Sequence, residues 1–547
     1  MEKTILIGGK AGQGTTVTSH FIGETFCALG YYVFNYRDYP SLIRGGHNFN
    51  VLEISEKPVY SHRGKYDIIM AFDQKTVDLH QKNLKKGGVV LGDKTLKAKN
   101  LHPIDIKPIL EKLKAPQIIE NDILIGWLFK YFGVDKKFLL EESEKVFKGK
   151  KWELIKKSIE IGYDLAEKKE DFKKRGKKKY FISGSEGVGI GAINAGMDIY
   201  IAYPMTPATP VMHYLASKQL KQDISVLQLE NEISVINTAL GASFAGAKTM
   251  VGTSGGGFAL MTEAMSLCGI SEIPLVVYLA QRPGPATGVP TYTSQSDLKF
   301  ALNAGHGEFA RIVVAPGDSQ EAIIRTQEAF YLSFKYRTLA IVMSDKHCAE
   351  ADFSFDELKV SSLPSERFII KKPSQNYKSY QITENGVSPR AVPGQGPIVR
   401  ATSYEHNEYG NTIEDAEWII KMNDKRLKKA KYIKQEVNKL KPVSLYGKGK
   451  NLIIGWGSTK GAILEALPEI KNFRFLQISY LSPFPKEAVE KEIKKSKKVI
   501  LVENNATGLL GDVIAEQTGC IIKDKILKYD ARPFIPEDII SKINKKI

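Results

Sequence analysis

A chain of 547 residues is long enough for several domains, and 43% apolar residues can supply a core for each of them. Its apolar runs, such as IPLVVYLA, are far shorter than the roughly 20 residues that a membrane-spanning helix needs. The N-terminus shows no pattern of a cleaved secretory signal. We therefore expect a soluble, cytoplasmic protein.

The formal net charge of +17 raises the question of an acidic partner. The lysines lie in separate patches (KKRGKKK, KRLKKAKYIK, KEIKKSKK), and 61 acidic residues are interspersed with them. This distribution favours a solvated surface, and no zinc-finger spacing or aromatic-glycine RNA-binding pattern accompanies it. We expect no nucleic-acid partner.

The cysteines are too dispersed to form a local metal site. Cys27, Cys268, Cys348 and Cys520 lie far apart, and the sequence contains no C-x-x-C pair. This spacing excludes a self-contained iron–sulfur or zinc site and predicts no disulfide framework. We expect no metal on this chain, so a redox metal has to belong to another chain.

The first segment, residues 1–170, reads as an α/β domain. The strand KTILIGG, the turn KAGQG and a helix over about Thr15–Leu29 are followed by the strand patterns YYVFNY, FNVLEI, YDIIMAF and GGVVLGD, which we interpret as strand–helix alternation. Helical patterns over about Asn121–Lys168 close the domain. The polar, basic residues 171–179 are predicted to form a linker.

The glycine turn GGKAGQGTT tests a nucleotide-binding interpretation. The position where a Walker A loop carries its lysine is Thr15, and the position where a dinucleotide fingerprint carries its last glycine is Val17, so both motifs fail. Glycines before a helix still present N–H groups to an anion. Gly12, Gly14 and Arg44 are therefore candidates for anion or coenzyme A binding, and a tight structural turn is the alternative.

Three further segments follow. Residues 180–350 form a second α/β domain, and residues 351–445 are irregular apart from a charged helix near 413–440. Such a segment is expected to wrap over other domains or a partner. Strand–helix alternation returns in residues 446–547, which we assign to a third, small α/β domain.

The second domain repeats one arrangement: a buried strand, a stiff or glycine-rich loop, and a polar residue. YPMTPATP, with three prolines, follows the strand IYIA and holds the hydroxyls of Tyr203 and Thr206 in a rigid loop. TSGGGF leads into a helix at Ser254, and the strand VVYLAQ ends at Arg282, before a second proline-rich loop with Thr291. Because open α/β sheets bind ligands at the carboxyl ends of their strands, these residues predict one site.

Two carboxylates, Glu230 and Glu232, begin a helix rich in small residues (LENEISVINTALGASFAGA). Helix capping, favoured by the helix dipole, is one interpretation of such a pair. A catalytic or cofactor-binding acid is the other, and spacing alone leaves both open.

Three stretches of this domain, GSEGVGIGAINAGMDIYIAYPMTPATP, ENEISVINTALGASFAGAKTMVGTSGGGF and QRPGPATGVPTYTSQSD, closely resemble the α subunit of 2-oxoacid:ferredoxin oxidoreductases. Residues 1–170, with GGKAGQGTTVTSHFIGE and YPSLIRGGHNFNVLEIS, are similar to the γ subunit of the same enzymes. The last domain resembles their transketolase C-terminal-like domain. The chain thus resembles the fused γ–α form.

The resemblance implies a multidomain α/β protein whose residues 180–350 bind the pyrimidine half of thiamine diphosphate. By position, Glu232 is similar to the acid that contacts the aminopyrimidine ring. There it promotes general-base catalysis relayed through the cofactor, worth about 10²–10⁴ in rate. Glu230 is then a bystander. The positions that match cofactor contacts are Tyr203, Pro204, Glu232, Thr253, Ser254, Gly255 and Gly256.

Thr206, Arg282 and Thr291 match positions that contact the 2-oxoacid, and a guanidinium suits its carboxylate. The implied reaction is a reversible, coenzyme A-dependent oxidative decarboxylation that passes electrons to ferredoxin. The resemblance places the diphosphate, Mg²⁺ and an iron–sulfur cluster on a separate β subunit, so this chain alone is expected to be inactive. The substrate is left open between 2-oxoglutarate and pyruvate-like acids.

Two other functions fit the sequence less well. A non-catalytic binding or regulatory subunit of the same fold is disfavoured because Thr206, Glu232, Arg282 and Thr291 are all present. A nicotinamide-dependent dehydrogenase is disfavoured because the chain lacks the G-x-G-x-x-G fingerprint at the expected place.

Overall fold

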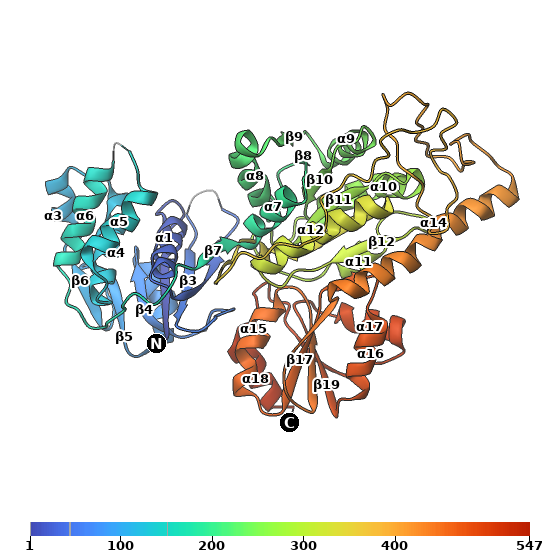
Figure 1. The fold of residues 1–547 in the computed structure, drawn as a ribbon. Coiled ribbons are helices and arrows are strands. Elements are labelled where there is room, and N and C mark those ends of the chain that lie inside the picture. The colour runs from blue at the N-terminus through green and yellow to red at the C-terminus, as the bar shows by residue number, and fades with distance from the viewer. Residues whose placement is uncertain (1, 43–44, 150, 547) are drawn as a thin grey trace. The chain divides into compact units, whose positions relative to one another are not determined.

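The computed structural model describes residues 2–42, 45–149 and 151–546. The chain divides into two compact units. The smaller unit comprises Met1–Ile182, Ala351–Leu358 and Ile535–Asp538, and the larger unit comprises Ser183–Glu350, Lys359–Phe534 and Ile539–Ile547. Both units combine helices with β-sheets (Figure 1), which confirms the predicted multidomain α/β class.

The sheet of the smaller unit has the strand order β6-β5-β4-β1-β3-β2-β14-β7. β1 is parallel to β4 but antiparallel to β3, and β3 pairs antiparallel with β2. The predicted strand–helix alternation is therefore wrong for β2 and β3, because the segment between them is too short for the crossover of a dozen or more residues that parallel strands need. The strands are β1 (Glu2–Gly9), β2 (Tyr32–Asp38), β3 (Asn48–Ser55), β4 (Tyr66–Ala71), β5 (Leu84–Asp93), β6 (Leu101–Ile104), β7 (Tyr180–Ser183) and β14 (Asp352–Phe355).

Helices cover this sheet and share an aromatic core with it. Phe26 in α1 stacks on Phe129 in α4, with ring centroids 5.2 Å apart. The helices are α1 (Thr15–Ala28), α2 (Gln74–His80), α3 (Ile106–Leu113), α4 (Glu120–Tyr131), α5 (Lys136–Val146) and α6 (Trp152–Asp164), with 3₁₀ turns at Gln81–Asn83 and Gln117–Ile119.

The stretch predicted as a basic linker, residues 171–179, contains no helix or strand but is fixed to the smaller unit. Phe172 is buried, and its ring centroid lies 4.9 Å from that of Phe132. The backbone N–H groups of Arg175 and Lys179 donate to the carbonyls of Leu29 and Cys27. One buried aromatic ring and these backbone hydrogen bonds thus anchor a segment whose composition predicts exposure to solvent.

The first sheet of the larger unit has the order β18-β12-β13-β11-β10-β8-β9, and all neighbouring pairs except β18–β12 are parallel. Parallel strands end at one edge, which is where open α/β sheets bind ligands. The strands are β8 (Ile199–Ala202), β9 (Ser225–Gln228), β10 (Thr249–Thr253), β11 (Leu275–Gln281), β12 (Arg311–Val314), β13 (Leu339–Asp345) and β18 (Tyr480–Ser482).

The helices of this sheet begin at recognisable caps. Ser183 and Glu186 form a capping box at the start of α7, and the side chains of Asn231 and Asp318 cap α9 and α12. The helices are α7 (Gly184–Asn194), α8 (Thr209–Gln222), α9 (Glu232–Phe244), α10 (Gly255–Ser271), α11 (Leu298–Leu302), α12 (Ser319–Tyr336) and α13 (Lys346–Glu350).

A second, smaller sheet in the larger unit has the order β15-β17-β16-β19-β20, with β15 antiparallel to the rest. Its strands are β15 (Val443–Gly447), β16 (Asn451–Gly455), β17 (Phe473–Ile478), β19 (Lys498–Glu503) and β20 (Asp524–Leu527). The helices of this C-terminal region are α15 (Thr459–Ala466), α16 (Lys486–Lys494), α17 (Leu509–Thr518) and α18 (Pro536–Asn544), with a 3₁₀ turn at Leu467–Glu469.

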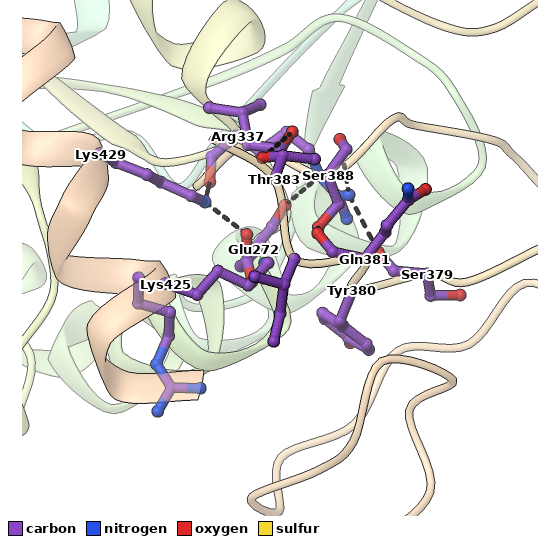
Figure 2. Close-up of polar contacts among 12 residues, drawn as sticks. Glu272, Arg337, Ser379, Tyr380, Gln381, Thr383, Ser388, Lys425 and Lys429 are labelled. Carbon is purple, nitrogen blue, oxygen red and sulfur yellow. Dashed lines mark hydrogen bonds and ion pairs between the residues drawn. The ribbon is translucent and has the colours of Figure 1, made fainter. Parts of the chain in front are cut away.

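Residues 359–415 have no helix or strand, and they lead into the long charged helix α14 (Ala416–Val437), followed by a 3₁₀ turn at Asn438–Leu440 (Figure 1). A buried ion cluster fastens α14 to the sheet region (Figure 2). Glu272, at the end of α10, forms ion pairs with Lys425 and Lys429 of α14, and all three side chains are buried.

Arg337 completes this Glu272 cluster (Glu272, Lys425, Lys429 and Arg337). Its Nε donates to the Glu272 carbonyl at 3.1 Å, and its Nη1 donates to the carbonyls of Ser379 and Ser388 in the irregular segment. The carboxylate therefore faces several cations. Burial lowers the pKa of Lys429 to about 8, and repulsion from Lys425 and Arg337 adds to that effect against the attraction of Glu272.

Candidate active site

The predicted site residues of the larger unit lie at or just beyond the carboxyl ends of β8, β9, β10 and β11, which are consecutive strands of its first sheet. The loop after β8 begins with Tyr203, whose side chain is exposed, and Pro204, which is partly buried. The carbonyl of Thr206 accepts a hydrogen bond from Nη1 of Arg282 at 2.8 Å. The end of β11 thus holds the proline-rich loop, and Thr206 and Arg282 are brought together.

Glu232 is the first residue of α9 and is 4% exposed. Its Oε1 atom is buried and has no hydrogen-bond partner among the described residues. The neighbouring Glu230 is exposed and accepts a hydrogen bond from the Ser234 hydroxyl, while Asn231 caps the helix. Glu232 is therefore not needed to cap α9, because Asn231 caps it. An unsatisfied buried carboxylate oxygen costs free energy and points to an absent ligand.

The glycines after β10 shape the wall opposite Glu232. A Cβ atom at Gly257 would overlap Glu232 Oε1 and Thr253 Oγ1, whereas one at Gly256 would meet nothing within 4 Å. Ser254 occupies the N-cap position of α10 but makes no capping hydrogen bond, and its buried hydroxyl has no partner within the described chain. The first turn of α10 is thus closely packed against Glu232 on one side and open at Gly256.

The loop after β11 adds a further carboxylate to this turn. Oδ2 of Asp297 lies 2.7 Å from the position of a Cβ at Gly255, and it has no hydrogen-bond partner among the described residues. Asp297 is the N-cap residue of α11, yet it makes no side-chain cap. Burial raises its pKa to about 6, against an opposing effect of Arg282. Burial also lowers the pKa of Arg282, which Asp297 opposes in turn.

Thr291 lies in the same loop, six residues before Asp297. It is 6% exposed, and its Oγ1 atom is buried without a hydrogen-bond partner in the described part of the chain. No hydrogen bond among the described residues joins Thr291 to Thr206, Arg282 or Glu232. The structure therefore brings Thr206 into contact with Arg282, and it brings Glu232 and Asp297 to the first turn of α10. Among the described residues, Thr291 keeps an unpartnered hydroxyl in the loop that leads to Asp297.

The glycine turn at the N-terminus lies in the smaller unit. Gly12 has φ +91°, and a Cβ atom at its position would meet nothing within 4 Å, while Gly14 is the N-cap of α1 with φ +75°. Asn121 donates from Nδ2 to the carbonyl of Gln13 at 2.9 Å. Arg44, the third residue of the predicted anion site, lies outside the described residues.

Membrane spans and metal clusters are both absent from the described part of the chain. No helix in the described ranges is both long and apolar enough to cross a membrane. Within 2–42, 45–149 and 151–546, no group of three or more His, Cys, Asp and Glu side chains could hold a metal ion.

Comparison with known proteins places these features in a family. Residues 190–425 match the family described as "Pyruvate flavodoxin/ferredoxin oxidoreductase, thiamine diP-bdg", and residues 4–165 match "Pyruvate ferredoxin/flavodoxin oxidoreductase". The chain is 32% identical to the 2-oxoacid:ferredoxin oxidoreductase subunit alpha of a Sulfolobus species, over 100% of this chain and 97% of that protein. The chain belongs to the 2-oxoacid:ferredoxin oxidoreductase alpha subunits.

Two other relatives support this assignment. The 2-oxoglutarate synthase subunit KorA of Archaeoglobus fulgidus is 30% identical over 66% of this chain and 96% of its own length. A 2-oxoglutarate:ferredoxin oxidoreductase from Magnetococcus marinus, solved with 2-oxoglutarate, coenzyme A and succinyl-CoA bound, superimposes with a TM-score of 0.89 at 28% identity, over 100% of this chain and 99% of that one. The predicted resemblance to a γ–α fusion is confirmed, as is the predicted enzyme class.

One residue of this alpha subunit's candidate site was not predicted from the sequence. Asp297 lies within the motif QRPGPATGVPTYTSQSD, from which only Arg282 and Thr291 were predicted to act. An acid just before a short helix is typical of an N-cap, so sequence alone favours a structural role. Its missing cap hydrogen bond and its unpartnered Oδ2 become visible only in the folded chain.

Proposed function

We propose that this alpha subunit, together with a beta subunit, carries out the coenzyme A-dependent oxidative decarboxylation of a 2-oxoacid, with 2-oxoglutarate as the first candidate substrate. The observation that carries the proposal is the buried, unpartnered Oε1 of Glu232 beside the open first turn of α10. The relatives named for 2-oxoglutarate support the choice of substrate.

The residues present fit the pyrimidine half of thiamine diphosphate. That cofactor supplies the carbanion chemistry by which a 2-oxoacid loses carbon dioxide. A planar ring needs a flat, open approach and a carboxylate at its edge, and Gly256 and Glu232 offer both. Through a charge-assisted hydrogen bond, the Glu232 carboxylate keeps a nitrogen of the pyrimidine ring protonated, as a general acid–base residue does. We assign cofactor contacts also to Tyr203, Pro204, Thr253, Ser254 and Gly255.

The 2-oxoacid is assigned to the side of the site where Arg282 meets Thr206. Arg282 donates one hydrogen bond to the Thr206 carbonyl at 2.8 Å, and its remaining N–H groups suit a substrate carboxylate. This bond also holds the stiff loop of Thr206 in place, which matters because about 1 Å of misplacement can lower a rate on the order of 10²-fold. Thr291 contributes its unpartnered hydroxyl.

The remaining parts of the reaction are assigned to other chains and to the smaller unit. We place Mg²⁺, the iron–sulfur cluster and the diphosphate contacts on the beta subunit, with ferredoxin as the electron acceptor. The N–H groups around Gly12 and Gly14, together with Arg44, remain candidates for an anion such as a coenzyme A phosphate. We also propose that the complex acts in the cytoplasm.

The direct test is to produce the chain with its native beta subunit and to assay viologen reduction over a panel of 2-oxoacids with coenzyme A. The complex should reduce viologen with 2-oxoglutarate only when thiamine diphosphate and coenzyme A are both present. The chain alone should be inactive. A complex that binds thiamine diphosphate but turns over none of the 2-oxoacids would favour a non-catalytic subunit.

Replacing Asp297 by asparagine is expected to remove a pH dependence of 2-oxoacid binding centred near pH 6. Burial raises the pKa of Asp297 to about 6, so above this pH its carboxylate is ionised and opposes an anionic substrate beside Arg282. The wild-type dissociation constant should therefore rise by up to about tenfold as pH increases through this range, and the variant should show no such rise.

The measurement is calorimetric titration of the assembled complex with 2-oxoglutarate, without coenzyme A or ferredoxin. The other charged groups at the site are Arg282 and Glu232, and both stay in place in the variant. Asp512→Asn is the control, because Asp512 is a partly exposed acid of α17 whose side chain pairs with Lys299 at 3.7 Å. An unchanged pH profile in the Asp297 variant would contradict this role.

A further inference from the structure

The carboxyl edge of the C-terminal sheet is occupied by another part of the same chain. β16 and β19 are neighbours and parallel, and Trp456 and Asn504 follow their carboxyl ends directly. In an open α/β fold this edge is where a ligand is expected. Here it receives Gln295, a fully buried residue from the loop that follows β11.

Every polar group of Gln295 is hydrogen-bonded to this edge. Its backbone N–H donates to the Asn504 carbonyl at 2.8 Å, and its Oε1 accepts from the Asn504 N–H at 2.9 Å. Its Nε2 donates to the Trp456 carbonyl at 2.9 Å, and its carbonyl accepts from Nδ2 of Asn505 at 3.0 Å. A buried amide satisfied on all sides is held in one position.

The partners of Gln295 are themselves anchored. Nδ2 of Asn504 donates to the carbonyls of Lys528 and Arg532, and Nδ2 of Asn505 also donates to the buried carboxylate of Glu503 at 3.0 Å. Oε1 of Glu503 accepts a further hydrogen bond from Nε1 of Trp456 at 2.9 Å. The edge that grips Gln295 is therefore a connected polar network.

The same loop carries two residues of the candidate active site on either side of Gln295. Thr291 lies four positions before it, and Asp297 lies two positions after it. Asp297 is held at its backbone by Oε1 of Gln281, at 3.0 Å, and Thr293 donates to Asp345 at 3.0 Å. Gln295 is thus one of the anchored positions of this loop, and it lies between the free hydroxyl of Thr291 and the free carboxyl group of Asp297.

We propose that Gln295 is a positioning residue of the reaction: the carboxyl edge of the C-terminal sheet grips it and thereby sets where Thr291 and Asp297 lie in the 2-oxoacid site. This inference rests on the proposed function, because it assigns the 2-oxoacid to that loop. In this proposal the C-terminal sheet contributes to substrate recognition through the stretches GWGST and ENNATG, which hold Gln295.

The test uses the complex with the beta subunit and the variant Gln295→Ala, which loses the side-chain bonds to Asn504 and Trp456. The KM for the 2-oxoacid should rise by about tenfold or more, while the thiamine diphosphate concentration for half-maximal activity stays within about twofold of wild type. Amide hydrogen exchange over residues 289–298 should become faster, which is a readout independent of activity.

Two controls separate positioning from general damage. Ser296→Ala changes an exposed neighbour in the same loop, and Tyr446→Phe removes a hydrogen bond to Gln477 elsewhere in the C-terminal sheet. Both should keep the wild-type KM. If Gln295→Ala does not assemble, Gln295→Glu tests the same point, since it keeps the acceptor for Asn504 and turns the donor for Trp456 into an acceptor.

The proposal is overturned if the Gln295 variants keep the wild-type KM and exchange rates. It is overturned as well if KM, cofactor requirement and melting temperature all change together as in a general loss of stability. An inactive wild-type complex would instead contradict the proposed function, while faster exchange at 289–298 in the variant would still support the grip on the loop.

Discussion

Replacing Glu232 by glutamine in the assembled complex is expected to lower turnover by at least about 100-fold, equivalent to about 2.7 kcal/mol of transition-state stabilisation. The amide keeps the size and shape of the side chain but cannot hold a proton on the cofactor ring as a carboxylate can. The measurement is viologen reduction at saturating 2-oxoacid, coenzyme A and thiamine diphosphate.

The same substitution should not lower the stability of the chain. Oε1 of Glu232 has no hydrogen-bond partner among the described residues, so the fold loses no interaction when that oxygen is changed. Functional sites commonly hold such unsatisfied groups. A melting temperature at or above that of the wild type, together with the loss of turnover, would identify Glu232 as a residue kept for function.

Glu230→Gln is the matched control. Glu230 lies two residues away, is exposed, and accepts a hydrogen bond from Ser234. It should keep turnover within about twofold of wild type, because a solvated carboxylate contributes little. Equal losses in both variants, or full activity in Glu232→Gln, would remove the assignment of Glu232.

Replacing Glu272 by glutamine is expected to destabilise the larger unit by about 3–5 kcal/mol. The substitution removes the only carboxylate of the Glu272 cluster and leaves Lys425 and Lys429 buried beside Arg337 without a compensating charge. Unpaired buried charges are far more costly than a lost surface ion pair. Urea denaturation of the full chain, followed by tryptophan fluorescence, measures the change.

The contribution of Glu272 has a defined pH range. Lys425, Lys429 and Arg337 hold its pKa well below the usual value, against the opposing effect of burial. A carboxylate with a depressed pKa in the folded state stabilises fully above its unfolded pKa of about 4.3 and loses that contribution as pH falls through the folded value. The Glu272 carboxylate itself should therefore add no pH dependence at neutral pH, and its contribution should be lost only in strong acid.

Glu417→Gln in α14 is the control for this prediction. Glu417 pairs with Lys421 at 2.6 Å, but its side chain is 77% exposed. Such a pair contributes about 0.3–0.5 kcal/mol, so the control should unfold nearly as the wild type does. A Glu272 variant as stable as this control would show that the buried cluster adds nothing to the attachment of α14.

Short-range signals in the sequence predicted much of the candidate site. Prolines after a strand, glycines before a helix and a carboxylate at a helix start are local features, and they made Thr206, Ser254 and Glu232 candidates, while the family resemblance supplied their expected roles. These local features could not predict the contacts between loops. The bond from Arg282 to the Thr206 carbonyl joins residues 76 positions apart, and it depends on two strands lying in the same sheet.

The strand pairings and contacts that local patterns did not predict have the same origin. β14 completes the sheet of the smaller unit from residue 352 onwards, and β18 joins the first sheet of the larger unit from residue 480. Neither pairing leaves a trace in local periodicity. Phe172 was overlooked because composition averages over a stretch and hides one buried ring among lysines.

The pairing of β14 with β2 decides what the N-terminal third of the chain can do when separated. Asp352 of β14 is fully buried and binds Arg37 at 2.8 Å and Asn35 at 2.8 Å, so the late strand supplies both an edge and a charge to the early domain. A fragment ending near residue 182 uncovers the hydrogen-bonding side of β2. Because an exposed strand edge can pair with other chains, this fragment should self-associate. The fused α-subunit segment therefore also completes the sheet of the N-terminal domain.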